Sequence, residues 1–279
     1  MTTTRLPTCA LIISLFCSLA NADSIGINFT DSNDVVFGSG VSAGAPGYAQ
    51  ANWNHFITDW SGNAPNDALF TAGVTDDSGA NISGSLLLNI AYDGQSDPVH
   101  FDAANTWRSG SGNTTADHTL LNGYLDDGGD DQPYLNLQIA AGKTYDVVVY
   151  LNGDNGGSSQ GRYWLEEWSD PLAAGTPVTD LIGVAANGGF SGTYTQVGGA
   201  NFGASAIPVN QDVSAGHYLV FENISISNLR IRSAGNGDPE AFGRGPLNAV
   251  QIVNIIPEPS SLALGLMGMV LLRTLRFRR

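Results

Sequence analysis

Cysteine and basic residues are scarce in this chain of 279 residues, and each shortage argues against a class of protein. The only two cysteines, Cys9 and Cys17, lie near the N-terminus, so the remaining residues hold no disulfide, thiol nucleophile or thiolate metal site. Lys and Arg number 11 against 26 Asp and Glu, which gives a net charge of −15. Contacts to phosphate need clustered basic residues, so this balance argues against a protein that binds nucleic acid.

Charged residues of either sign are also few, at 13% of the chain against a usual share of roughly 25%. A helical bundle needs charged outer faces and few glycines, whereas this chain has 35 Gly. Wholesale disorder is disfavoured as well, because hydrophobic residues make up 42% and aromatic residues 9%. The composition therefore favours a glycine-rich, acidic body built mainly from β-strands.

The first 22 residues have the pattern of a secretory signal peptide. Arg5 supplies the positive charge, and Ala10–Leu19 is a mostly apolar stretch, shorter than the roughly 20 residues that a membrane span needs. Ala20 and Ala22 occupy the small-residue positions of a cleavage site before Asp23. We therefore expect a signal helix over residues 1–22 that directs export and is removed by signal peptidase.

The C-terminus carries a Pro-Glu-Pro sequence, an apolar run and a basic end, in that order. Pro257, Glu258 and Pro259 precede the uncharged run Ser261–Leu272. The run is short for a membrane span, but a long basic side chain at its end can reach the membrane surface and extend it. Because positive residues stay on the cytoplasmic side, the segment predicts a short transmembrane helix with the body outside. The basic end consists of Arg273, Arg276, Arg278 and Arg279.

This tail, residues 257–279, resembles the PEP-CTERM sorting tail of bacterial proteins that are processed by an exosortase. The resemblance implies recognition by that membrane enzyme, removal of the tail, and delivery to the cell surface or the extracellular matrix. Such tails have also been labelled ice-binding protein C-terminal domains, a name that implies nothing about ice. A tail anchor that is never processed is the alternative, and in either case the tail is an address without catalysis.

Between the two ends, residues 23–256 are interpreted as one domain without repeats or long linkers. This body contains six basic and 25 acidic residues, which leaves a net charge of −19. Such a surface repels polyanions and can gather divalent cations. Apolar runs bounded by turn residues predict a series of strands. These runs are Ser24–Phe29, Leu69–Thr75, Ser85–Ala91, Tyr134–Ala140, Thr144–Leu151, Arg162–Trp168, Gly192–Val197, His217–Phe221, Ile224–Arg232 and Leu247–Ile256.

Only one stretch of the body, Thr115–Leu125, has the apolar spacing of a helix, with Asp117 as its expected N-cap. Many short strands, Gly-rich turns and almost no helix predict an all-β fold, an antiparallel β-sandwich or jelly roll. Strands at the two ends of the body, Ile25–Phe29 and Ala249–Ile256, are expected to pair and close a sheet. In architecture the predicted body resembles the galactose-binding-like β-sandwiches, a likeness of arrangement and not of motif.

The densest acidic segment, Asp126–Asp131, combines four aspartates with two glycines. Calcium prefers several oxygen ligands on a flexible loop, so Asp127, Asp130 and Asp131 are candidate calcium ligands. The segment lacks the ligand spacing of a helix–loop–helix calcium site, and a solvated acidic turn is the alternative. Asn152–Gly157 is a second loop with oxygen ligands, for which a Gly/Asn turn is the simpler explanation.

No residue pattern predicts catalysis, and we expect a protein that is not an enzyme. Glu166 and Glu167 are neighbours on a predicted strand, so their side chains point to opposite faces and cannot flank one glycosidic bond. The histidines are far apart and have no metal-binding spacing, and the sequence has neither a nucleophile elbow nor a phosphate-binding glycine motif. The histidines are His55, His100, His118 and His217.

Tryptophan is the residue type most suggestive of a ligand, because flat aromatic faces stack on sugar rings. Trp53 and Trp60 have polar neighbours in the sequence, and Trp164 and Trp168 are four residues apart on one predicted strand, which places them on one face. These four residues are candidate glycan-stacking residues. Core aromatics are the alternative, and an exposed pair would indicate a binding platform.

Together these features predict an exported, exosortase-sorted protein of the cell surface or extracellular matrix that is not an enzyme and binds extracellular polysaccharide. The open alternatives are a secreted carbohydrate-active hydrolase with two unidentified carboxylates and a calcium-dependent structural adhesin. Calcium is the one candidate cofactor that the sequence suggests. The expected partners are signal peptidase, the exosortase, and the membrane through the tail before processing.

Overall fold

The computed structural model divides the chain into two compact units, Asp23–Asn254 and the combined terminal segments Met1–Ala22 and Ile255–Arg279. The signal segment, the sorting tail, Trp60 and the acidic segment Asp126–Asp131 lie outside the residues that the structure describes. Those residues are 24–31, 34–58, 74–81, 88–93, 106–108, 110, 112, 114–125, 132–138, 142–153, 159–169, 175–187, 190–197, 215–235 and 245–254.

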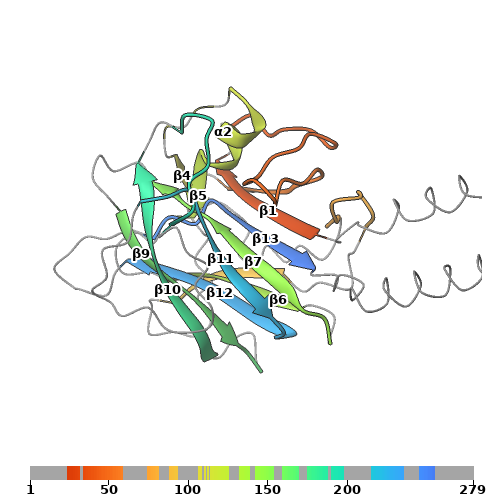
Figure 1. Cartoon of the computed structure of the whole chain (residues 1–279), viewed down its shortest axis with the longest axis vertical. Coiled ribbons are helices and arrows are strands. Elements are labelled where there is room, and N and C mark those ends of the chain that lie inside the picture. The colour runs from red at the N-terminus through yellow and green to blue at the C-terminus, as the bar shows by residue number, and fades with distance from the viewer. Residues whose placement is uncertain are drawn as a thin grey trace, which may run out of the picture. The chain divides into compact units, whose positions relative to one another are not determined.

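Two large β-sheets dominate the described body (Figure 1). The five-stranded sheet has the order β11 (Tyr218–Ile224), β7 (Tyr145–Tyr150), β13 (Ala249–Asn254), β1 (Ser24–Asp31) and β2 (Asn54–Thr58). The six-stranded sheet has the order β3 (Leu88–Asp93), β6 (Gln132–Gln138), β12 (Asn228–Gly235), β9 (Ser159–Glu167), β10 (Thr176–Asn187) and β8 (Asn152–Gly153). A small third sheet pairs β4 (Thr106–Arg108) with β5 (Gly123–Leu125), and α2 spans Ala116–Leu120. The prediction of an all-β fold is confirmed.

The first and last strands of the body are neighbours, as the sequence predicted. β1 and β13 pair antiparallel, with Ser24 opposite Val253 and Asn28 opposite Ala249. β13 also pairs antiparallel with β7, whereas β1 pairs parallel with β2. The two ends of the body therefore meet in the interior of the five-stranded sheet and not at its edges.

The predicted helix Thr115–Leu125 is wrong in its length and in its N-cap. α2 has only five residues, and the chain continues into β5 after a short turn. Thr115 is the N-cap, because its side-chain oxygen accepts a hydrogen bond from the His118 N–H. The carboxylate of Asp117 is used elsewhere, in a contact with the loop around Gly44.

Two of the predicted strands are also corrected. Gly192–Val197 forms no strand, and its ladder contact is a single isolated bridge between Gln196 and Tyr218. The run Ile224–Arg232 belongs to two different sheets, since β11 ends and β12 begins inside it. The alternation of apolar residues slips at Asn228, and this is the residue at which the second strand starts.

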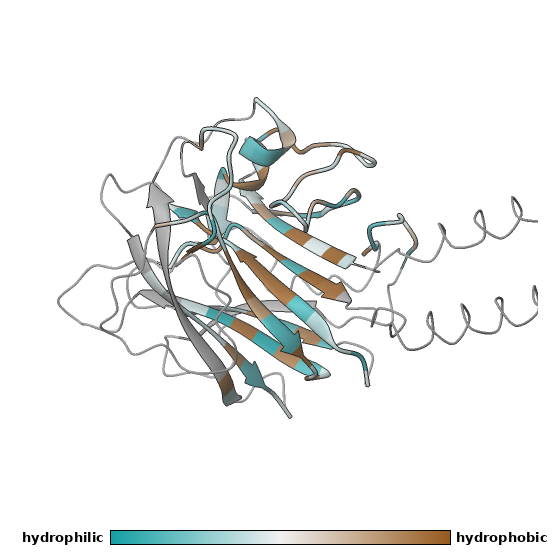
Figure 2. Cartoon of the chain, viewed as in Figure 1, coloured by the Kyte–Doolittle hydropathy of each residue, from teal (hydrophilic) through white to brown (hydrophobic). Residues whose placement is uncertain are grey.

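The five-stranded sheet is covered by apolar side chains on both faces. On β7, Val147 and Val149 belong to one hydrophobic cluster, while Val148 and Tyr150 belong to another. The first cluster also contains residues of β6, β9 and β12, so it is a core shared by the two large sheets. Figure 2 shows the corresponding bands of hydrophobic and hydrophilic residues along the strands. Burial on both sides explains why the sequence of β7 is almost continuously apolar.

Asn248 lies just before β13 and joins several elements through hydrogen bonds. Its side chain, which is fully buried, donates to the carbonyls of Leu121 and Gly123 at 3.0 and 2.9 Å. Its backbone N–H donates to the Tyr150 carbonyl at 2.9 Å, and its carbonyl accepts from the Phe29 N–H at 2.9 Å. One residue thus connects the end of α2, β5, β7 and β1.

Replacing Asn248 with alanine should destabilise the body strongly. The change leaves the carbonyls of Leu121 and Gly123 without this donor, at a cost of about 3 kcal/mol. The melting temperature should fall by roughly 6–12 °C, which thermal unfolding followed by circular dichroism would measure. The exposed Gln138, which carries the same amide group, provides the control, because Gln138→Ala should change stability by no more than about 0.5 kcal/mol. Equal melting temperatures for the two variants would contradict the role of Asn248.

Candidate functional site

Trp53, one of the predicted glycan-stacking residues, is a core residue. It is 6% exposed, and its indole N–H donates to the carbonyls of Ala43 and Gln50 at 3.1 and 3.2 Å. Its ring packs edge-on against Tyr150, with 5.7 Å between the ring centroids. With its N–H paired and its ring covered, Trp53 presents no open face to a sugar.

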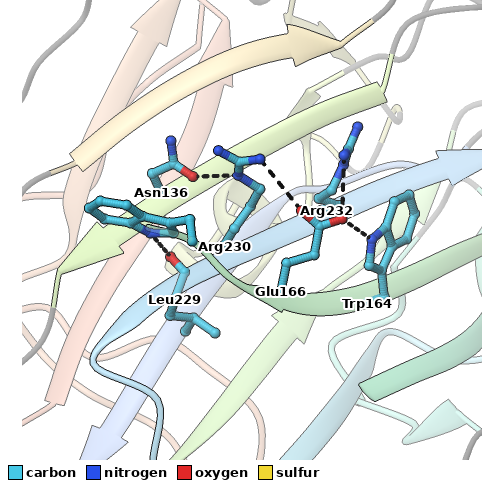
Figure 3. A network of polar contacts seen from close by, with 7 residues as sticks. Asn136, Trp164, Glu166, Leu229, Arg230 and Arg232 are labelled. Atoms are coloured by element: carbon cyan, nitrogen blue, oxygen red, sulfur yellow. Dashed lines mark hydrogen bonds and ion pairs between the residues drawn. The ribbon is translucent and has the colours of Figure 1, made fainter. Parts of the chain in front are cut away.

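Trp164 belongs to a buried polar cluster on the six-stranded sheet (Figure 3), and Trp168 is hydrogen-bonded to Leu229 in the same sheet. They are 7% and 5% exposed, so these two residues do not form the exposed pair that would indicate a platform. The Trp164 indole donates to Glu166 at 2.6 Å, and the Trp168 indole donates to the Leu229 carbonyl at 3.1 Å. Trp60 lies outside the described residues.

Glu166 is the centre of this cluster and is only 4% exposed. Its Oε1 accepts from Arg232 at 3.3 Å, and its Oε2 accepts from Arg230 at 3.5 Å. Arg230 also donates to the side chain of Asn136 at 2.7 Å, and its guanidinium lies 4.4 Å from the centre of the Tyr134 ring. Desolvation lowers the pKa of Arg230 from its ordinary value, against the opposing effect of Tyr134 and Glu166.

The register of two strands creates this cluster. In the antiparallel pair β9–β12, Glu166 is opposite Arg230 and Trp164 is opposite Arg232. Both oxygens of Glu166 are engaged by neighbouring side chains, so the cluster acts as an internal ion-pair network that fixes β9 to β12. Glu167, by contrast, is exposed, which confirms that the two adjacent glutamates point to opposite faces.

A second group of side chains covers the face of the five-stranded sheet that points away from the shared core. We call this group the aromatic layer. Its rings come from segments far apart in the sequence and contact one another at centroid distances of 4.8 to 6.5 Å. Such pairs stabilise by about 0.5–1.5 kcal/mol beyond the burial of their area. The layer consists of Tyr48, His118, Tyr150, Phe190, Tyr194, His217 and Tyr218.

Part of the aromatic layer is accessible. Tyr48, His118, Tyr194 and His217 are each partly exposed, whereas Phe190 is buried between the two histidines and Tyr194. The layer therefore offers ring surface to the solvent, which the buried tryptophans do not. A sugar ring that lies on an aromatic face needs this kind of surface.

Three partly exposed carboxylates accompany the aromatic layer. Asp117 accepts a hydrogen bond from the Tyr194 hydroxyl at 3.0 Å. Burial raises the pKa of Tyr48 to about 12, together with the negative charges of Asp146 and Glu222 nearby. The layer thus combines apolar ring faces with strong hydrogen-bond acceptors, which is the chemistry that recognises hydroxyl groups on a ring.

The segment 190–197, which carries two of the rings, is held against the start of β11. The His217 N–H donates to the Thr195 carbonyl at 2.7 Å, and the Thr195 N–H donates to Nδ1 of His217 at 3.1 Å. Burial lowers the pKa of His217, in keeping with a neutral ring that accepts at Nδ1. Gly216 permits the approach, because a Cβ there would lie 2.8 Å from the Thr195 carbonyl oxygen.

Within the described residues, no group of three or more His, Cys, Asp or Glu side chains is placed to hold a metal ion. Asp127, Asp130 and Asp131 lie outside that part of the chain, so calcium binding stays a prediction. In the second candidate loop, Asn152 and Gly153 form the buried strand β8. No helix in the described ranges is long and apolar enough to cross a membrane.

The histidines that the structure describes have partners within the fold. His55 is hydrogen-bonded to a backbone carbonyl, and burial lowers its pKa. His118 and His217, which are distant in sequence, both pack edge-on against Phe190. In each pair the ring centroids of the histidine and the phenylalanine are 5.1 Å apart. His100 lies outside the described residues.

Comparison with known proteins gives no relative for this chain: no protein-family model, curated protein or solved structure matches it. The aromatic layer must therefore be interpreted from its geometry. Sequence reasoning missed it because tyrosine and histidine were scattered over loops and strands without a shared spacing. One signal was present, since Tyr48 and Phe190 directly follow glycines and Tyr194 lies two residues after Gly192.

Removing the charge of Glu166 should lower the free energy of unfolding of the body. Glu166→Gln leaves two buried guanidinium groups without their counter-ion, which costs about 3–5 kcal/mol. The matched control is Glu167→Gln, the same chemical change at the exposed next residue, with an expected effect within about 0.5 kcal/mol. Urea unfolding of both variants would measure the difference. Similar midpoints would mean that the ion-pair network contributes little.

Proposed function

We propose that this protein is exported and sorted by an exosortase to the cell surface or extracellular matrix, where it binds glycans without catalysing a reaction. The proposal has two parts: export and sorting signals at the two ends of the chain, and a binding face in the body. The partners are signal peptidase and the exosortase during processing, the membrane through the tail, and extracellular polysaccharide afterwards.

The proposal of export and sorting rests on the sequence of the two ends. Ala20 and Ala22 supply the cleavage pattern of the signal. Pro257, Glu258 and Pro259, followed by the apolar run and the terminal arginines, supply every element of a PEP-CTERM tail. The terminal arginines favour a cytoplasmic end, which agrees with a signal that exports the body.

For the body, the proposal is a β-sandwich of the jelly-roll type, similar to the galactose-binding-like folds. Support comes from the two large, mainly antiparallel sheets and from the hydrophobic cluster to which both contribute. The pairing of β1 with β13, which brings the ends of the body together, is a further argument for this architecture.

One observation carries the binding part: the partly exposed aromatic layer, with carboxylates beside it, on an otherwise covered sheet face. The buried Trp164 and Trp168 give no such support. Glu166, engaged on both oxygens, is a poor candidate for a glycosidase carboxylate. Binding therefore agrees better with the geometry than hydrolysis does.

Sorting by an exosortase predicts a mature protein with a truncated C-terminus. After processing, protein recovered from the surface or matrix of its native host should lack Arg273–Arg279, because the exosortase removes the tail. Intact-mass measurement of that material decides between the two possibilities. A full-length C-terminus would contradict processing and favour a permanent tail anchor.

The binding face predicts that glycan affinity depends on Tyr48. In a glycan array with the exported protein, Tyr48→Ala should weaken binding about tenfold, the loss expected for an aromatic contact worth roughly 1.4 kcal/mol. Val178→Ala, at an exposed residue of β10 in the other sheet, is the control and should bind normally. Release of reducing sugar would point to the hydrolase instead, and binding only with added calcium would point to the adhesin.

A further inference from the structure

The chemistry around the aromatic layer also constrains which saccharides can bind there. At one end of the layer, Tyr48 lies close enough to Asp146 and Glu222 for both carboxylates to raise its pKa. At its centre, Asp117 accepts a hydrogen bond from Tyr194, and its negative charge helps to raise the pKa of Tyr150. Three carboxylates, Asp117, Asp146 and Glu222, therefore lie next to these accessible rings.

A bulge in β11 helps to bring two of these acids together. The register of β11 against β7 shifts between Phe221 and Ile224, and Asn223 has a positive φ of 60°. The Asn223 N–H donates to Oδ1 of Asp146 at 3.0 Å. This contact places the Asp146 carboxylate beside Asn223, the neighbour of Glu222. The bulge therefore helps to keep Asp146 and Glu222 close together.

The buried arginines lie on the other large sheet and are engaged there. Arg230 and Arg232 both pair with Glu166, with side chains only 3% and 6% exposed. Their positive charge is thus bound to an internal anion and not directed to the aromatic layer. The body as a whole adds a net charge of −19, which repels polyanions.

We infer that the aromatic layer takes uncharged saccharides and rejects those that carry carboxylates or sulfates; this inference rests on the glycan-binding function proposed above. The ring faces provide the apolar contact, and the carboxylates accept hydrogen bonds from sugar hydroxyls. A uronate or sulfate at the same place would meet the like charges of these carboxylates, which is unfavourable. Asp146 and Glu222 are then residues that determine specificity.

The test is binding of the exported protein to immobilised neutral polysaccharides and to polyuronates. The neutral panel is β-glucan, mannan and galactan, and the acidic panel is alginate and polygalacturonate. At low salt, we expect binding to at least one neutral polymer and at least tenfold weaker binding to the polyuronates. Glu222→Gln should weaken neutral binding several-fold and reduce the discrimination against polyuronates, and Asp146→Asn should do the same.

Glu167→Gln is the matched control, since it removes the same charge from an exposed position on the other large sheet. It should leave both affinities unchanged, which separates local recognition from the net charge of the body. Thermal unfolding of each variant checks that the fold is retained. Preferential binding of polyuronates would overturn this inference while leaving glycan binding intact. Binding to neither panel would instead contradict the proposed function itself, and the inference with it.

Discussion

The hydrogen bonds of Asn248 are the constraint on which most of the described body depends. Its side chain and backbone reach β1, β5, β7 and the end of α2 from one fully buried position. Inside a protein such groups must be paired, because a buried carbonyl or N–H without a partner is costly. The sheet that carries the aromatic layer and the helix that borders the layer are thereby fixed to each other. The binding face proposed for this protein depends on an amide that never meets the ligand.

The two faces of the five-stranded sheet perform different tasks. Val147 and Val149 of β7 point into the core shared with the six-stranded sheet, while Tyr150 points to the aromatic layer. A single sheet thus provides stability on one side and accessible ring surface on the other. The segment 190–197 lies close against this second face, and it can do so because Gly216 has no side chain. Turn glycines in this sequence therefore matter for the site and not only for the loops.

Sequence reasoning predicted the fold class because alternation and turn residues are local signals. The strands at the two ends, from Ser24 and up to Asn254, were found and their pairing was anticipated. The helix was predicted too long, because apolar spacing at Leu121, Tyr124 and Leu125 arises from burial in a turn and a strand as well. Trp53, Trp164 and Trp168 were predicted to face sugars, but their burial depends on tertiary neighbours that sequence spacing does not contain. The aromatic layer was missed for the same reason, since its rings meet only after the chain has folded.

The burial of Arg230 and Arg232 has a consequence for how many copies of the protein can share one surface. The body has only six basic residues against 25 acidic ones, and Glu166 balances one of these two buried charges, so a large excess of acids remains on the outside. Neighbouring copies in a crowded layer would then repel one another over the screening length, about 10 Å at 0.1 M salt. Rising ionic strength would shorten that range and let the molecules approach. At the cell surface proposed for this protein, the lateral density of the molecules would then depend on the salt of the medium as well as on the amount of protein.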